Sequence, residues 1–188
     1  MVRQWKTAVL MLLWLSLMTG LLYPLFITGV AQVVFARQAD GSLIDRDGEL
    51  VGSALIGQAN HDPRYFWPRP SAVGYDPLPS GATNWGPTSA ELAAAVAERA
   101  AAIRQANHLS PTATIPTDLL FASASGLDPH ISPAAARLQI DRVAAARHLD
   151  PEQVADLVRQ HTEGPQLGLL GQPRVNVLLL NLALDEVE

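Results

Sequence analysis

Five residues between positions 123 and 132 carry side chains of the kind used in nucleophilic or acid–base catalysis. They are Ser123, Ser125, Asp128, His130 and Ser132. A serine hydrolase brings its histidine to about 3 Å from the nucleophilic hydroxyl, and its triad is assembled from distant segments. No G-x-S-x-G elbow surrounds these serines. We therefore expect Asp128 and Ser132 to cap the following helix. A hydrolase that uses Ser125, His130 and Asp128 remains the alternative.

Other catalytic and metal-binding patterns are missing from the sequence. The five histidines show neither H-x-x-x-H nor H-E-x-x-H spacing, so no metal site is predicted. Lys6 is the single lysine, which excludes a G-x-x-x-x-G-K-[ST] phosphate loop and the D-K-T-G phosphorylation motif. The chain has no cysteine, which excludes disulfides, thiolate zinc sites and a cysteine nucleophile. The residues thus predict a non-catalytic chain that binds no cofactor directly.

A long uncharged segment near the N-terminus predicts a membrane-spanning helix. The residues from Thr7 to Ala36 carry no formal charge and lie between Lys6 and Arg37. About 20 apolar residues span a bilayer core, whereas the apolar region of a signal peptide has about 7–15. This length favours a retained helix over a cleaved signal peptide. Pro24 predicts a kink, or a helix that packs against protein.

The charges on either side of this segment predict its orientation. The short N-terminal tail carries Arg3, Lys6 and the amino group, and the next twenty residues after the span carry Arg37 and Arg46. This slight bias favours a cytoplasmic N-terminus. The predicted parts are a cytoplasmic tail at 1–6, a transmembrane helix at 7–36 and a periplasmic domain at 37–188. The chain is then a single-pass protein of the bacterial plasma (inner) membrane, in contact with membrane lipid.

The exported part is acidic, with 11 basic and 18 acidic residues in 37–188. Its net charge of −7 argues against a nucleic-acid partner and against adhesion to anionic lipid by charge. Its length is ample for one globular domain, and its pattern predicts an α+β fold in which one mixed α/β domain follows the N-terminal helix. Residues 37–49 predict a linker or a short hairpin.

The expected elements of this domain are short strands and three helices. Helices are predicted to begin at Thr88, at Ser132 and at Asp150, and strands to lie at 50–58 and 118–122. Thr88 with Glu91 fits a capping box, and Ser132 and Asp150 each precede a proline, the residue favoured at the first helical position. The closing run 175–182 fits a strand or a helix equally well.

Residues 63–87 form a proline-rich segment that contains most of the aromatic residues outside the predicted span. Six prolines and three glycines make the backbone irregular. The aromatic side chains are Tyr65, Phe66, Trp67, Tyr75 and Trp85. A segment so rich in aromatics is no flexible linker. It either packs onto its own domain or docks against another protein, and buried and docked aromatics look alike in a sequence.

Several strings dense in glycine, proline and asparagine follow the hydrophobic segment in a fixed order. They are GSALIGQ at 52–58, YFWPRPSA at 65–72, SGATNWGPTS at 80–89, FASASGLDPHISPAAA at 121–136 and HTEGPQLGLLGQPRVNVLLLNLALD at 161–185. Together, and in this order, they resemble the KdpC family, the C subunit of the bacterial Kdp potassium-transporting ATPase. The resemblance covers essentially the whole chain. Asn60, Ala82, Thr83 and Gln172 depart from the family pattern.

The resemblance implies an accessory, non-catalytic subunit of a four-part complex that uses ATP to import potassium with high affinity. Its partners would be a channel-like potassium-binding subunit, a P-type ATPase subunit and a small single-helix subunit. Such a subunit is expected to assemble and stabilise the complex and to raise the affinity of the ATPase subunit for ATP. ATP and potassium would be handled by the complex.

The predicted topology places the domain outside the cell, whereas ATP is inside. We therefore hypothesise that the domain caps the outer mouth of the potassium-conducting subunit, through segments 63–87 and 124–133. The predicted contact residues are Tyr65, Phe66, Arg69, Trp85, Asp128 and His130. The competing interpretation is that both segments simply pack within the domain.

Overall fold

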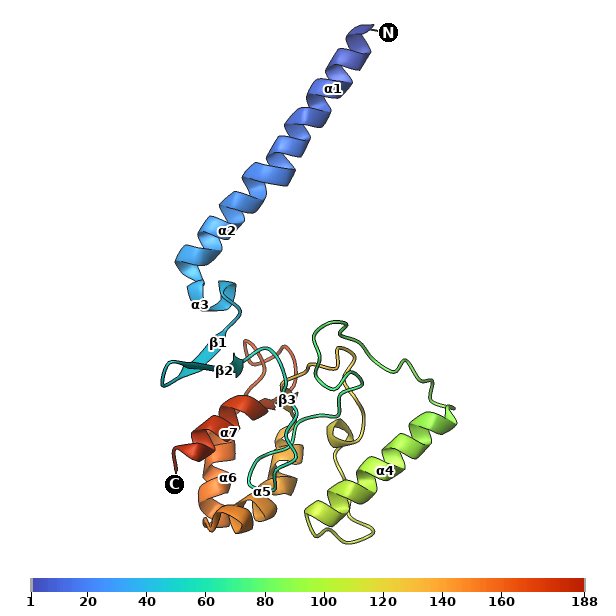
Figure 1. Ribbon diagram of the computed structural model, residues 1–188, viewed down its shortest axis with the longest axis vertical. Coiled ribbons are helices and arrows are strands. Elements are labelled where there is room, and N and C mark those ends of the chain that lie inside the picture. Colours follow the sequence, from blue (N-terminus) through green and yellow to red (C-terminus); the bar gives the residue numbers. More distant parts are fainter. Residues whose placement is uncertain (1, 188) are drawn as a thin grey trace. The chain divides into compact units, whose positions relative to one another are not determined.

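The computed structural model describes residues 2–187, and the chain divides into two compact units with the boundary between Ser53 and Ala54 (Figure 1). The first unit contains the N-terminal helix, a short helix of four residues and a hairpin, and the second contains the remaining helices and strands. The predicted mixed α/β class is confirmed, and so is one N-terminal helix long and apolar enough to cross a membrane.

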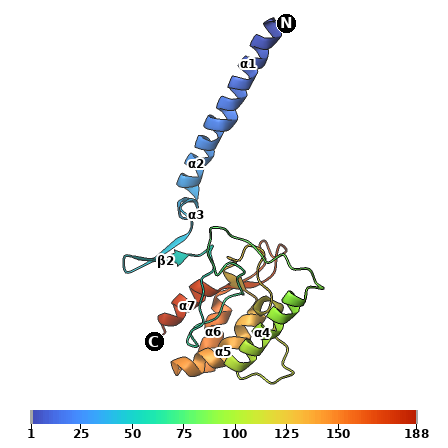
Figure 2. The ribbon, with the colours of Figure 1, turned by 45° about the vertical axis from the view of Figure 1, so that its right-hand side comes forward.

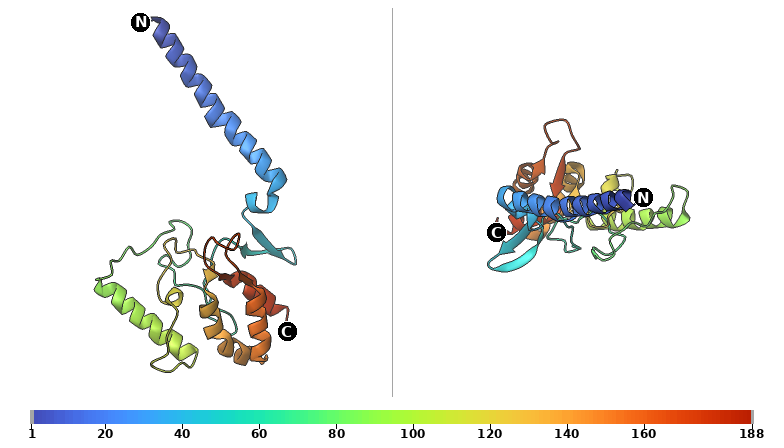
Figure 3. Two further views of the ribbon diagram at one scale, coloured as in Figure 1. Left: turned by 180° about the vertical axis from the view of Figure 1, so that it is seen from behind. Right: turned by 90° about the horizontal axis from the view of Figure 1, so that it is seen from above.

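The N-terminal helix runs without a break through three segments, from Val2 to Val34 (Figure 3). These are α1 (Val2–Leu17), the π-helical turn η1 (Met18–Leu22) and α2 (Tyr23–Val34). The backbone N–H of Tyr23 bonds to the carbonyl of Met18, five residues back. Pro24 follows, and a proline removes one hydrogen bond of the ordinary helical ladder and crowds the preceding turn. The wider π turn lies where this crowding falls, so the helix continues through the proline.

A short hairpin follows the helix. After α3 (Ala36–Ala39), strand β1 (Leu43–Arg46) pairs antiparallel with β2 (Glu49–Ser53). Asp47 and Gly48 form the turn with φ values of 57° and 82°, the left-handed conformation that two-residue hairpin turns require. The strand predicted at 50–58 therefore ends at Ser53. Residues 54–58 leave the hairpin, and the N–H of Gly57 bonds to the carbonyl of Leu127 instead.

The second unit is dominated by helices, and its strands are very short. Its helices are α4 (Ala90–Ala106), the single 3₁₀ turn η2 (Thr117–Leu119), α5 (Pro133–Arg147), α6 (Pro151–Gln160) and α7 (Val177–Asp185). Its strands are β3 (His130–Ile131), β4 (Thr162–Glu163) and β5 (Arg174–Asn176), antiparallel in the order β3-β5-β4. Helices α5, α6 and α7 pack side by side (Figures 1 and 2).

Two of the three predicted helix starts are confirmed, and the third moves by one residue. Ser132 caps α5 by accepting a hydrogen bond from the N–H of Ala135, and Asp150 caps α6 in a complete capping box. The cap of α4 is Ser89, which accepts from Leu92 N–H at 3.1 Å, and not Thr88. The reason is that Ser89 has the extended backbone that a cap needs, so the helix begins only at Ala90.

The strand predicted at 118–122 is wrong, because this segment makes the 3₁₀ turn η2 instead. The Asp118 carboxylate accepts from the backbone N–H of Ser132 at 2.5 Å and from its hydroxyl at 3.1 Å. The closing run contains both a strand and a helix. Asn176 ends β5 and caps α7, since its side chain accepts from Leu179 N–H at 3.1 Å. Its amide also donates to the carbonyl of Ala54 at 2.7 Å.

Phe66 belongs to the hydrophobic core of the second unit. It is fully buried, in one cluster with aliphatic side chains from β3, α5, α6, β5 and α7. The best-buried of these are Ile131, Val143, Val154, Val158, Val175, Leu180 and Leu184. An apolar side chain of this size contributes about 1.5–3 kcal/mol when buried. Segment 60–75, which carries Phe66, is therefore an integral part of the fold.

Segment 60–75 has no neighbouring strand, and two buried side-chain amides supply the backbone hydrogen bonds that such a strand would make. Asn181 of α7 accepts from the N–H of Phe66 at 2.8 Å and donates to its carbonyl at 3.0 Å. Gln139 of α5 does the same for Trp67, at 2.8 and 3.2 Å. Buried backbone groups need partners, because water cannot reach them. We call this arrangement, with the arginines described next, the backbone clamp.

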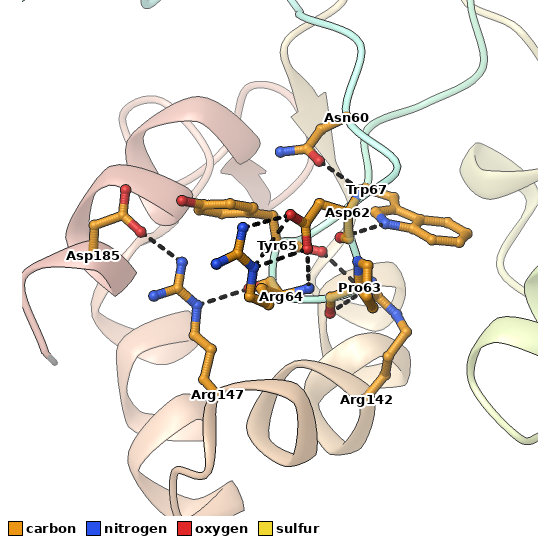
Figure 4. A network of polar contacts seen from close by, with 9 residues as sticks. All are labelled: Asn60, Asp62, Pro63, Arg64, Tyr65, Trp67, Arg142, Arg147 and Asp185. Atoms are coloured by element: carbon orange, nitrogen blue, oxygen red, sulfur yellow. Dashed lines mark hydrogen bonds and ion pairs between the residues drawn. The ribbon is translucent and has the colours of Figure 1, made fainter.

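Arg142 of α5 extends the backbone clamp toward the start of the segment (Figure 4). Its guanidinium donates to the carbonyls of Pro63 and Tyr65 at 2.6 and 3.0 Å. The same group lies 4.5 Å from the centroid of the Trp67 ring, a cation–π contact. Burial lowers the pKa of Arg142 to about 10, so this side chain stays charged at neutral pH.

Arg147, five residues after Arg142 at the end of α5, completes the backbone clamp (Figure 4). It donates to the carbonyl of Arg64 at 2.8 Å and forms an ion pair with Asp185 of α7 at 2.5 Å. Its guanidinium lies 4.6 Å from the centroid of the Tyr65 ring. Burial raises the pKa of Tyr65, and hydrogen bonding to Asp185 raises it further. Tyr65 is therefore a neutral phenol held between α5 and α7.

Replacing Asn181 with leucine tests the backbone clamp. The substitution keeps the volume but leaves the N–H and carbonyl of Phe66 buried without their partner, so we expect a loss of about 2–4 kcal/mol in unfolding free energy. Urea unfolding of the detergent-solubilised chain measures this. The matched control is Gln105→Leu on the exposed face of α4, expected to change stability by less than about 0.5 kcal/mol. Equal effects would contradict the clamp.

Candidate functional site

An ion pair and a histidine form the most distinctive polar cluster on the surface of the second unit. Arg69 Nη1 lies 2.9 Å from Asp128 Oδ2. The other oxygen, Oδ1, accepts from the backbone N–H of His130 at 3.0 Å and lies 3.3 Å from its Nδ1. The side chains are 24–28% exposed, so they are held in place yet reachable from outside. We call these three residues the Arg69 cluster.

The electrostatics of the cluster favour an ionised Asp128. Burial raises the pKa of this carboxyl, but hydrogen bonds from His130 and the contact with Arg69 outweigh burial and lower the pKa to about 2. The carboxylate is therefore charged at physiological pH, and it fixes both the guanidinium and the imidazole.

The backbone around the cluster is held by contacts between three segments that are distant in the sequence, at 52–58, 65–75 and 121–136. The Tyr75 hydroxyl donates to the carbonyl of Arg69, and the Ser71 hydroxyl donates to the carbonyl of Gly126 at 2.7 Å. Burial raises the pKa of Tyr75 to about 12, so this donor keeps its proton. At Gly57, a Cβ atom would lie 2.7 Å from the carbonyl oxygen of Asp128. Only glycine permits this close approach.

An open cleft of about 440 Å³ lies beside the Arg69 cluster. Its lining combines the cluster with Asp118, Ser132, Gln172, Pro173 and Arg174, among others. Most of these charges are already matched, since Asp118 accepts from Ser132 and Arg174 lies 2.9 Å from Glu163. Within residues 2–187, no group of three or more metal-binding side chains is found. The charged side chains of this cleft are thus fixed in pairs.

The structure brings together only three of the six predicted contact residues. Arg69, Asp128 and His130 form the cluster, whereas Tyr65 lies with Arg147 and Asp185 in the backbone clamp. Trp85 precedes α4 and is 40% exposed. No hydrogen bond or ion pair joins it to the other five in the part of the chain that the structure describes.

Phe66 requires a correction. It was predicted at a partner interface, but it is 0% exposed and packs in the core. A side chain without exposed surface cannot contact a partner while the domain remains folded. The hydrophobic effect explains the difference, since a large aromatic ring gains most where it is enclosed on all sides. Of the two interpretations of this aromatic segment, packing within the domain therefore holds for Phe66.

The hydrolase alternative gains no support from the geometry. The hydroxyl of Ser125 accepts from the N–H of Leu127 at 3.1 Å, while His130 is directed to Asp128. Among the described residues no hydrogen bond links Ser125 to His130. Asp128 also differs from the expected helix cap, since it bonds the N–H of His130 and the guanidinium of Arg69.

Sequence reasoning missed the polar side chains that position the site. Gln139, Arg142 and Arg147 lie on the buried side of α5, and Asn181 on that of α7. A signal for them exists: in a helix of mostly alanine and aliphatic residues, polar side chains at helical spacing interrupt the apolar stripe. The carbonyls and N–H groups that they bind lie more than 70 residues away, and no local pattern reveals such partners.

Comparison with known proteins gives one consistent result. The family model described as "KdpC: K+-transporting ATPase, c chain" matches residues 5–186. A potassium-transporting ATPase KdpC subunit of Methylococcus capsulatus is 54% identical over 188 residues, covering 98% of each chain. Proteins of the same name are 52% identical in Geobacter metallireducens, over 97% of each chain, and 54% identical in Sorangium cellulosum, over 96% of each.

The low pKa of Asp128 predicts a specific dependence of stability on pH. Its folded-state pKa of about 2 lies below the ordinary 3.8, so the ionised carboxylate stabilises the fold above about pH 4. This contribution is lost as the pH falls toward 2. We expect Asp128→Asn to be less stable than the wild type at neutral pH, with the difference shrinking between pH 4 and 2. Denaturant unfolding at each pH measures it.

Asp141→Asn is the matched control, because Asp141 is an exposed carboxylate on α5. It should leave the stability profile close to that of the wild type. A difference between wild type and Asp128→Asn that stays constant down to pH 2 would refute the proposed role of the ionised carboxylate.

Proposed function

This chain belongs to the KdpC family, the c chain of potassium-transporting ATPases, and we propose that it serves there as a non-catalytic subunit that assembles and stabilises the complex. The match of the family model to residues 5–186 carries this proposal, because it includes both the N-terminal helix and the folded unit. The partners would be a channel-like potassium-binding subunit, a P-type ATPase subunit and a small single-helix subunit.

We also propose a topology for the chain. The helix Val2–Val34 would cross the bacterial inner membrane once, with the N-terminus in the cytoplasm and the domain in the periplasm. Support comes from Arg3 and Lys6, which place two positive charges in the short N-terminal flank, as is typical of a cytoplasmic side.

The Arg69 cluster is the part of the domain that we propose to contact the potassium-binding subunit, over its outer mouth. The three side chains are partly exposed and already oriented by one another, so little conformational entropy would be lost on docking. Trp85 offers a partly exposed aromatic side chain, the residue type enriched at interfaces. Tyr65 would act mainly by holding the segment that carries Arg69.

The proposed effect on ATP affinity would be indirect. With the domain outside and ATP inside, the influence must pass through the transmembrane helix and its contacts with the ATPase subunit. Such coupling needs only a helix whose contacts differ between two states of its partner. The π turn at Met18–Leu22 lies within this helix and is a point where its backbone hydrogen bonding departs from that of a regular helix.

Co-purification tests the assembly role. We expect the affinity-tagged chain, expressed with the rest of its complex in cells grown at low potassium, to bring down a P-type ATPase and a channel-like protein in fixed ratio. The charge-reversing substitution Arg69→Glu should reduce their recovery about tenfold or more, because it places two carboxylates together at the interface. Quantitative mass spectrometry of the eluate gives the ratio.

The matched control is Arg159→Glu, which disrupts an exposed Arg–Asp pair on α6 at the surface of the same domain. It should leave recovery unchanged. Circular dichroism of both variants separates loss of docking from loss of folding. A wild-type chain that is folded and recovered alone would refute the subunit proposal itself.

The absence of cysteine allows a clean test of topology. A Gln105→Cys substitution on the exposed face of α4 introduces the single thiol of this chain. We expect a membrane-impermeant maleimide to label it once the outer membrane is permeabilised, without lysis of the inner membrane. Labelling only after lysis would reverse the proposed orientation. Gln4→Cys, in the N-terminal tail, keeps Arg3 and Lys6 and should show the opposite pattern.

A further inference from the structure

The loop between β4 and β5 exposes three leucines to solvent. Leu167, Leu169 and Leu170 are 91, 87 and 61% exposed, although each is a large aliphatic side chain. The loop, residues 164–173, projects beyond the helices of its unit in the view from above (Figure 3). We call it the leucine loop. It belongs neither to the hydrophobic core nor to the backbone clamp.

Hydrogen bonds along its own backbone give the leucine loop a defined shape. The N–H of Gln166 donates to the carbonyl of Leu170 at 2.8 Å, and the N–H of Leu170 donates back at 2.9 Å. Leu167 has a φ of 54°, a conformation that costs a residue with a side chain about 1–2 kcal/mol. The local turn therefore holds Leu167 in a strained geometry with its side chain in solvent.

The leucine loop is also an uncharged area on an acidic domain. None of its ten residues carries a formal charge, and the nearest charges, Glu163 and Arg174, pair with each other at 2.9 Å across its base. Three large apolar side chains exposed within four residues are the kind of surface that marks an interaction site on a soluble protein. The occupant of this surface must itself be apolar and uncharged.

Three observations favour a protein over a lipid bilayer as the occupant. Membrane-interface anchors typically combine aromatic with basic side chains, and the leucine loop has neither. The domain carries a net charge of −7, which anionic lipid repels. Finally, a strained and internally bonded turn presents one fixed shape, which a fluid bilayer does not require and a shaped pocket does.

The leucine loop adjoins the Arg69 cluster. Gln172 and Pro173, at its end, line the same open cleft as Arg69, Asp128 and His130. The C-terminal end of the leucine loop and the polar cluster thus border the same cleft. Stable interfaces commonly combine an apolar centre with a polar rim in this way.

We propose that the leucine loop inserts Leu167, Leu169 and Leu170 into an uncharged, apolar hollow on the extracytoplasmic face of a membrane subunit of the same complex. This inference rests on the proposed function and extends its interface from the Arg69 cluster to residues 164–173. The loop supplies buried apolar area, and the cluster fixes the orientation.

Leu169→Cys tests the location of the loop in the assembled complex. The substitution introduces the single thiol of this chain at a side chain that is 87% exposed in the structure. We expect it to react with a bulky maleimide about tenfold more slowly in the purified complex than in the isolated chain, because access limits the reaction. Val187→Cys, at a 43% exposed position after α7, should react at similar rates in both.

Leu169→Glu tests whether the contact matters. A charge buried in an apolar hollow is strongly disfavoured, so recovery of the partner subunits should fall about tenfold or more, while circular dichroism stays unchanged. Val187→Glu is the matched control and should assemble as the wild type does.

Each other outcome overturns the inference. Equal thiol reactivity in the complex and the isolated chain, with normal assembly of Leu169→Glu, leaves the loop without a partner. Protection of the isolated chain in lipid nanodiscs, with quenching of an attached fluorophore by spin-labelled lipid, assigns the loop to the bilayer. Concentration-dependent protection of the isolated chain in detergent assigns it to a second copy. In all three cases wild-type co-purification is unaffected, so the proposed function would stand.

Discussion

The structure depends on one constraint: an extended segment with buried backbone groups lies against helices and has no neighbouring strand. In a sheet, the adjacent strand would satisfy these groups. Here Asn181 and Gln139 each bond both backbone groups of one residue, and Arg142 and Arg147 bind the carbonyls of the three residues that come just before these two. Because unsatisfied buried groups are costly, the segment has a single favourable register, and Phe66 enters the core in that register.

The position of the Arg69 cluster follows from that register. Arg69 comes three residues after Phe66, so the anchoring that buries the ring also fixes the guanidinium near Asp128. Close backbone contacts then complete the surface, with Gly57 against Asp128 and Gly126 beside Ser71. The sequence strings that carry the family resemblance thus contact one another around the Arg69 cluster. Residues such as Gly57 and Gly126 recur in them because the backbones approach closely there.

Local features were predictable from the sequence, and long-range ones were not. The caps at Ser132 and Asp150 and the long apolar helix depend on neighbours within a few residues, so their pattern is visible in any window. The strand expected to continue to Gln58 and the interface role expected of Phe66 failed, because contacts with Leu127 and Asn181 decide them. Residue type alone singles out Asp128 and His130 as neighbours. The ion pair of Asp128 with Arg69 is not visible in any local pattern, because the two residues are 59 positions apart.

The hairpin that follows the N-terminal helix shortens the connection between that helix and the domain. Since β2 returns alongside β1, pairing Leu43 with Ser53, the chain gains little length over these residues. The linker between the end of α2 and the start of the hairpin consists of α3 and a few further residues. It can span only about 25 Å. If the helix is anchored in the membrane beside a partner, as proposed, so short a linker keeps the effective local concentration of the domain near that partner in the millimolar range. Individually weak contacts then suffice to keep the domain bound to its partner nearly all the time, so a small interface is enough.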